Sequence, residues 1–121
     1  MADLHVEEFP WTAESHLEKV AVERLDDIVS PDWIVDHCLL KIDVQGYELR
    51  VLEGAVKTLD RIRVVLVETG IASLYADDAS FDEVYRFLTE RGFTYAGSVD
   101  QLMSPRDGRP LQQDSVFQKD I

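Results

Sequence analysis

The chain has 121 residues, and its 24 acidic and 12 basic side chains give a formal net charge of −12 with histidine neutral. This length corresponds to one domain or part of one, and a hydrophobic content of 45% is enough to form a buried core. So negative a surface repels phosphate groups, which argues against nonspecific binding to nucleic acid or to anionic lipid. We therefore expect small molecules, cations or basic proteins as partners.

The cysteine content and the apolar segments narrow the setting of the chain. Cys38 is the one cysteine in the sequence, which excludes an internal disulfide and a cysteine-cluster zinc site. No apolar run approaches the roughly 20 residues that span a bilayer. The acidic residues 1–8 also lack the basic flank of a signal peptide. These features predict a cytoplasmic protein with no membrane partner.

The N-terminal region reads as an arm followed by short elements. Residues 1–19 show no sustained hydrophobic period, so we expect an irregular arm there and a domain over residues 20–121. Val20 and Val22 alternate with more polar neighbours, which predicts a short strand. Leu25 opens a helical turn that should end at Ser30 and Pro31, because proline cannot continue a helix.

Two apolar runs in the middle of the chain predict buried strands. They cover residues 39–44 and 63–68 and are rich in leucine, isoleucine and valine. We expect the first to be a central strand buried on both faces. Between them, the apolar residues of 47–60 fall on one helical stripe, which predicts a single amphipathic helix covering one face of the sheet.

The last third of the chain predicts one helix and two strands. Ser80 and Glu83 have the spacing of a capping box, and Gly92 is placed to end the helix that follows. Residues 93–99 and 115–119 should be two closing strands that form an antiparallel pair. Strands that alternate with helices predict an α/β fold with a mostly parallel sheet and right-handed connections.

Asp43 and Glu68 are the candidate functional residues. Open α/β sheets bind ligands beyond the carboxyl ends of their strands, where these two acids stand. A carboxylate in an apolar run costs several kcal/mol to desolvate unless it has a partner. Asp43 could instead pair with Lys41 or bond the helix start at Tyr47, and Glu68 could be a hydrated strand-end acid. Two carboxylates are too few ligands for a metal ion, so no metal site is expected.

Residues 41–55, which read Lys-Ile-Asp-Val-Gln-Gly-Tyr-Glu-Leu-Arg-Val-Leu-Glu-Gly-Ala, resemble the central motif of the FkbM-type methyltransferases. The similarity extends over roughly residues 20–119, because further segments follow in the order of that family. They are Leu25-Asp26-Asp27, Val65-Leu66-Val67-Glu68, Ser80-Phe81, Arg91-Gly92-Phe93 and the closing Gln113-Asp114-Ser115-Val116-Phe117.

The resemblance implies methyl transfer from S-adenosylmethionine, usually to the hydroxyl oxygen of a small molecule or sugar. It also implies a partial doubly wound sheet of the class I methyltransferase type with a C-terminal antiparallel pair. By matching positions, Asp43 and Glu68 would be catalytic, with Asp43 also facing the cofactor. Gln45, Tyr47 and Glu48 would shape the pocket for the substrate.

The chain departs from the family in its glycines. They stand at positions 46, 54, 70, 92, 97 and 108, so the glycine-rich turn that approaches the cofactor in such folds has no counterpart here. The chain therefore resembles the C-terminal half of the domain. The strand before Asp43 would then have an open edge. We expect the N-terminal arm, a second copy of the chain or a separate N-terminal half to cover it.

Two other functions remain as alternatives. Without the glycine turn, the chain could be a non-catalytic, methyltransferase-like interaction or regulatory module. A receiver-type phospho-acceptor domain would use two neighbouring acids, a strand-end aspartate, a hydroxyl residue and a lysine. The residues that could supply this set are Asp26, Asp27, Asp43, Thr69 and Lys119. Too few positions separate the acid pair from Asp43 for the two crossovers that a receiver needs.

Overall fold

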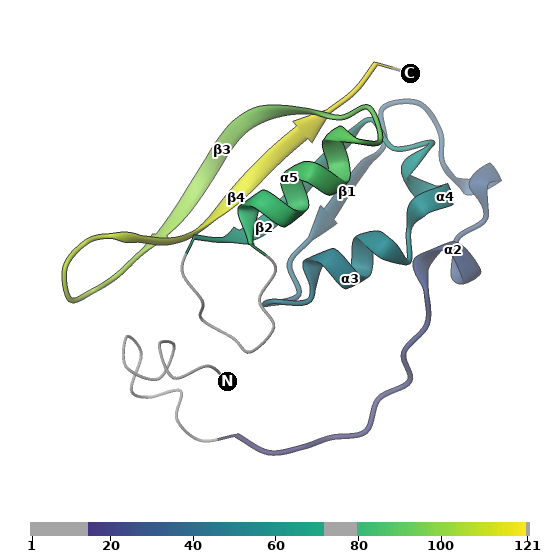
Figure 1. Ribbon diagram of the computed structural model, residues 1–121. Helices are drawn as coiled ribbons and strands as arrows, with labels where there is room; N and C mark the ends of the chain where they lie inside the picture. Colours follow the sequence, from purple (N-terminus) through teal and green to yellow (C-terminus); the bar gives the residue numbers. More distant parts are fainter. Residues whose placement is uncertain (1–14, 72–79, 121) are drawn as a thin grey trace.

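The computed structural model describes residues 15–71 and 80–120, which form one sheet with helices packed against it (Figure 1). The helical elements are α2 (Leu25–Ile28), the 3₁₀ turn η2 (Pro31–Trp33), α3 (Glu48–Glu53), α4 (Val56–Leu59) and α5 (Phe81–Thr89). The strands are β1 (Leu39–Ile42), β2 (Val64–Gly70), β3 (Thr94–Met103) and β4 (Pro110–Gln118).

The sheet of the described residues has the strand order β1-β2-β4-β3. β1 pairs with β2 in parallel, and β4 pairs antiparallel with both β2 and β3. β1, β2 and β3 therefore run in one direction, and β4 lies between β2 and β3 in the opposite one. The mixed α/β fold and the antiparallel C-terminal pair are confirmed. The expected parallel pairing is present only between β1 and β2 of the described strands, because β4 pairs antiparallel with both of its neighbours. A receiver domain of the 2-1-3-4-5 order has a different sheet.

The hydrophobic core lies between one face of the sheet, here called the inner face, and helices α3, α4 and α5. Alternate residues of β2 point into it, because successive side chains of a strand face opposite sides. The capping box of Ser80 and Glu83 is present at the start of α5. Gly92 follows that helix with φ 90°, as a helix-ending glycine should. The largest fully buried apolar side chains are Leu52, Leu59, Val65, Val67, Val84, Leu88, Leu111 and Phe117.

The single helix expected over 47–60 is wrong, because the structure has two helices that meet at Gly54 and Ala55. The amides of Lys57 and Thr58 bind the Asp26 carboxylate instead of carbonyl groups one turn earlier. A side chain from a distant segment thus caps a new helix at this point, and glycine at the junction weakens the helical alternative.

Two predictions about strands are also wrong. Val20 and Val22 form no strand and are 74% and 75% exposed, since no described strand pairs with them. β1 is the outer strand of the described sheet, and its Leu39 and Lys41 are exposed, so it is not a central strand buried on both faces. β3 and β4 extend beyond the expected 93–99 and 115–119 and form a longer hairpin.

None of the helices in residues 15–71 and 80–120 has the length and apolar character that crossing a bilayer requires. The expected arm over residues 1–19 lies mostly outside the described residues, and its described part, from Ser15 onward, is exposed and without helix or strand.

Candidate active site

Acidic residues from all four strands form one row, which we call the carboxylate row. Glu68 in β2 lies opposite Asp114 in β4, and Asp114 lies opposite Asp100 in β3. Asp43 directly follows β1, whose Ile42 pairs with Val67, so it stands beside Glu68. The pairing partner of each of the three acids within strands is thus another acid, and the two acids predicted from the sequence lie together.

The carboxylate row changes the acidity of Glu68. Burial raises the pKa of Glu68 to about 8, and a hydrogen bond with Asp43 and the charges of Asp43, Glu48 and Asp114 act in the same direction. Glu68 therefore holds its proton up to near neutral pH, because its ionisation beside the Asp43 carboxylate is unfavourable. This hydrogen bond accounts for Asp43 without the proposed pair with Lys41.

Asp114 responds to its surroundings in the same way. Burial raises the pKa of Asp114, the charges of Asp100 and Asp43 raise it further, and the Lys41 ammonium opposes them. A hollow of about 230 Å³ lies beside these groups. Carboxylates and amides dominate its walls, so it suits a ligand that donates hydrogen bonds. The lining residues are Glu68, Asp100, Gln101, Leu102, Gln112, Gln113 and Asp114.

The loop between β1 and α3 is held in an unusual conformation. Gln45 has φ 52° and Gly46 has φ 105°, and the left-handed region is costly for a residue with a side chain. The Gly46 amide donates to both oxygens of Glu48, at 2.9 and 3.2 Å. Glu48 is only 2% exposed, so these hydrogen bonds connect the loop to a buried side chain. Gln45 is exposed and lies close to Asp43 in the sequence. Contact of either residue with a substrate stays a prediction.

Tyr47 lies on the wall of a second hollow. It is 54% exposed and lines a space of about 690 Å³ between residues 21–28 and α3, together with Leu25, Ile28 and Val51. The structure thus places Asp43 and Glu48 close enough to Glu68 to raise its pKa, whereas Tyr47 lines a different hollow. A role of Tyr47 in substrate binding stays a prediction.

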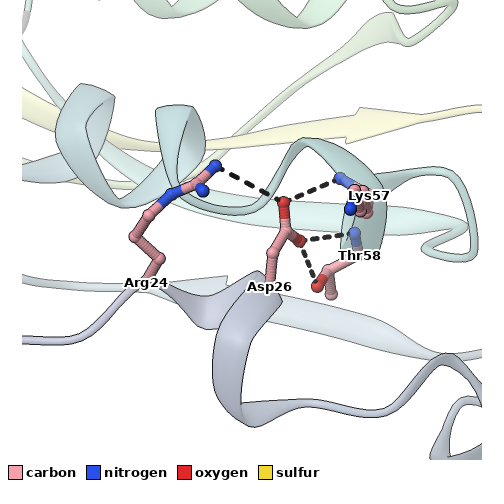
Figure 2. Close-up of polar contacts among 4 residues, drawn as sticks. All are labelled: Arg24, Asp26, Lys57 and Thr58. Atoms are coloured by element: carbon pink, nitrogen blue, oxygen red, sulfur yellow. Dashed lines mark hydrogen bonds and ion pairs between the residues drawn. The ribbon is translucent and has the colours of Figure 1, made fainter.

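Asp26 has a structural role that the sequence does not reveal. Its side chain is 4% exposed and accepts hydrogen bonds from the Lys57 amide (3.0 Å), the Thr58 amide (2.8 Å) and the Thr58 hydroxyl (2.7 Å), with Arg24 at 4.0 Å (Figure 2). Burial by itself would raise the pKa of Asp26, but these bonds outweigh it and lower the pKa. Asp26 therefore fastens residues 24–28 to the start of α4.

Asp100 and Asp114 are the residues of the site that the sequence analysis missed. The resemblance covers Asp114, but neither acid carries a motif of its own, and only the strand pairing brings them to Glu68. Within residues 15–71 and 80–120, no group of three or more histidine, cysteine, aspartate or glutamate side chains is arranged to hold a metal ion.

Comparison with known proteins found two similarities. Residues 3–95 match the family described as the Methyltransferase FkbM domain. The chain is also 33% identical to the 31-O-demethyl-FK506 methyltransferase FkbM of Streptomyces tacrolimicus over 102 residues. This match covers 84% of this chain and 37% of that relative. It thus spans little more than a third of the length of the relative. No solved structure matches the chain. Because the family match spans most of the chain and includes both Asp43 and Glu68, the chain belongs to the FkbM methyltransferase family.

Proposed function

We propose that this chain supplies the acceptor-activating part of an S-adenosylmethionine-dependent methyltransferase that acts on a hydroxyl group of a small molecule or sugar. The observation that carries the proposal is the Asp43–Glu68 pair at the ends of two neighbouring strands. Family membership supports methyl transfer as the reaction.

A hydroxyl acceptor needs a base, because its O–H bond must break while its new O–CH₃ bond forms. Glu68 suits this role, since a base with a pKa of about 8 is ionised often enough near neutral pH and still accepts a proton well. Asp43 keeps Glu68 basic through its charge and hydrogen bond. S-adenosylmethionine supplies the methyl group from a sulfonium, which becomes a neutral thioether, and the hydroxyl proton ends on Glu68.

The described residues fit the methyl donor by charge but not by shape. The carboxylate row is complementary to a sulfonium cation, and Asp43 is the member that we assign to the donor side. The glycines of this sequence include no pair two positions apart, so it offers no glycine-rich turn that lets a backbone approach the cofactor. We propose that the remaining contacts to the donor come from residues outside this sequence.

We further propose that these residues belong to a complementary N-terminal part that also covers the edge of β1. Two facts support this partner: β1 is the outer strand of the described sheet with Leu39 53% exposed, and the chain spans 37% of the relative. Together they would form a doubly wound sheet of the class I methyltransferase type. A second copy of the chain is the competing occupant of this edge, and a dimer of the isolated chain in light scattering would favour it.

Titration of the chain with S-adenosylmethionine tests the proposal. We expect a Kd of about 1 mM or tighter, which corresponds to about 4 kcal/mol, with NMR amide shifts in residues 43–46 and 68–70. Asp43→Asn should weaken binding, whereas Glu90→Gln, which changes an exposed acid, should not. Shifts confined to other regions would contradict the assignment of Asp43.

An activity assay distinguishes a catalytic chain from a non-catalytic module. The absence of a glycine-rich turn from the sequence favours the non-catalytic module. The unmatched part of the Streptomyces tacrolimicus relative is added to the chain, and methyl transfer to a panel of hydroxyl compounds is followed by mass spectrometry. We expect transfer that Glu68→Gln abolishes. A stable complex that binds the donor but transfers no methyl group would favour the regulatory module.

A further inference from the structure

Beneath the carboxylate row, the inner face of the sheet carries a buried polar network. Thr69 in β2 and Ser115 in β4 are both 0% exposed, and their hydroxyl oxygens lie 3.0 Å apart. The Gln113 side-chain amide donates to Ser115 Oγ (3.0 Å) and to the Tyr95 hydroxyl (3.2 Å). We call Thr69, Ser115 and Gln113 the hydroxyl network.

The donors and acceptors of the hydroxyl network are consistent with one direction. Thr69 has a single hydroxyl hydrogen, which it donates to the backbone carbonyl of Gln113 (3.3 Å). Ser115 must then donate to Thr69 Oγ1 and accept from the Gln113 amide. Both hydroxyl groups of the network, those of Thr69 and Ser115, thus have hydrogen-bond partners. This matters because an unsatisfied buried polar group costs about 1–3 kcal/mol.

The hydroxyl network and the carboxylate row lie at the same level on opposite faces of the sheet. Thr69 pairs with Gln113, and the adjacent pair in the ladder is Glu68 with Asp114. Like charges directly opposite each other on neighbouring strands destabilise the pairing, so the acids act to separate β2 from β4 where the hydroxyl network joins them.

We propose that Thr69, Ser115 and Gln113 are positioning residues that hold the ends of β2 and β4 together, so that Glu68 stays within reach of its acidic neighbours. The groups that face Glu68 are Asp43 after β1, Glu48 on α3 and Asp114 on β4. Asp100 on β3 and Lys41 on β1 act on Asp114. The inference rests on the proposed function only in giving Glu68 a role as base.

The test is the pKa of Glu68, measured by carbon-detected NMR of its carboxyl group in the isolated full chain. Thr69→Val keeps the shape of the side chain but loses the hydroxyl, and we expect it to lower the pKa of Glu68 by about half a pH unit as the acids move apart. Thr69→Ser restores a hydroxyl and should restore the pKa. Thr89→Val is the matched control, because the Thr89 hydroxyl bonds Tyr85 on α5, away from the row.

Ser115→Ala provides a second route if Thr69→Val does not fold, and it should lower the same pKa. A pKa of Glu68 that stays unchanged in a folded Thr69→Val or Ser115→Ala protein would overturn the proposal and leave the hydroxyl network a purely stabilising feature. No methyl donor is present in this experiment, so its result is independent of whether the chain transfers methyl groups.

Discussion

Asp26 has a buried carboxylate and Glu68 a partly buried one, yet their surroundings shift their pKa values in opposite directions. Asp26 meets two backbone amides and a hydroxyl, which lower its pKa despite burial. Burial raises the pKa of Glu68, and the neighbouring carboxylates add to this effect, so that its pKa reaches about 8. Ionised acids with several donors stabilise a fold, whereas acids held beside like charges are typical of functional sites. The comparison thus distinguishes Asp26, which stabilises the fold, from Glu68, which is the candidate base.

The largest expected effect is at the anchor. Asp26→Ala removes the cap of α4 and three hydrogen bonds to a charged acceptor, so we expect the free energy of unfolding to fall by about 2–4 kcal/mol. Urea unfolding at pH 7 measures it, with the exposed neighbour Asp27→Ala as the control. Because the folded-state pKa is lowered, the contribution of Asp26 is present above its ordinary pKa and is lost in acid. Equal losses of stability in Asp26→Ala and Asp27→Ala at pH 7 would contradict a stabilising role of the Asp26 hydrogen bonds.

Glu68→Gln should raise the free energy of unfolding at high pH, whereas Asp26→Ala lowers the free energy of unfolding. The folded chain binds more protons at Glu68 than the unfolded chain between the ordinary pKa of 4.5 and about 8, so the stability of the native protein declines as the pH rises through that window. Glutamine removes the decline and should stabilise the protein at pH 9 by about 1–2 kcal/mol, after allowance for solvent screening. Unfolding curves at pH 5, 7 and 9 measure this, and Glu90→Gln is the control. A parallel decline in both variants would exclude Glu68 as its source.

A third pair of substitutions ranks the neighbours of Glu68. Asp43→Asn removes a charge and changes the hydrogen bond to Glu68, so it should lower the pKa of Glu68 by about 1 pH unit. Glu48→Gln removes only a charge and should lower this pKa by a few tenths. Carboxyl NMR titration gives both values. A larger effect of Glu48→Gln would mean that Asp43 is not the principal partner.

The smallest effect concerns the strained loop. Gln45→Gly should stabilise the protein by about 0.5 kcal/mol, because glycine adopts a positive φ without steric cost. Gln118→Gly, at an exposed position of β4, should destabilise it instead. Thermal unfolding of both variants decides the point, and a loss of stability in Gln45→Gly would show that the Gln45 side chain contributes contacts of its own.

Local patterns in the sequence identify those elements whose stabilising contacts are local. The β-branched residues of β2 and the capping box at Ser80 are examples, and both are present in the structure. The strand predicted at Val20 and Val22 is wrong, because alternation of apolar and polar residues does not show whether a neighbouring strand is there to pair with. The break between α3 and α4 depends on Asp26, which lies some 30 positions earlier, and no local pattern marks Asp26 as a helix cap.

The candidate site shows the same division between local and distant information. Asp43 and Glu68 follow from the rule that ligands bind at the carboxyl ends of strands. Asp114 and Asp100 could not be predicted, because their place beside Glu68 depends on the insertion of β4 between β2 and β3.

That insertion has a consequence for the order of folding. β4 is synthesised after β1, β2 and β3, yet it occupies an interior place in the described sheet. Until residues 110–118 have been synthesised, β3 has no neighbour to join and one side of β2 is bare. Bare strand edges promote association between nascent chains. Synthesis of β4 therefore covers the facing edges of β2 and β3, whereas the outer edge of β1 stays exposed.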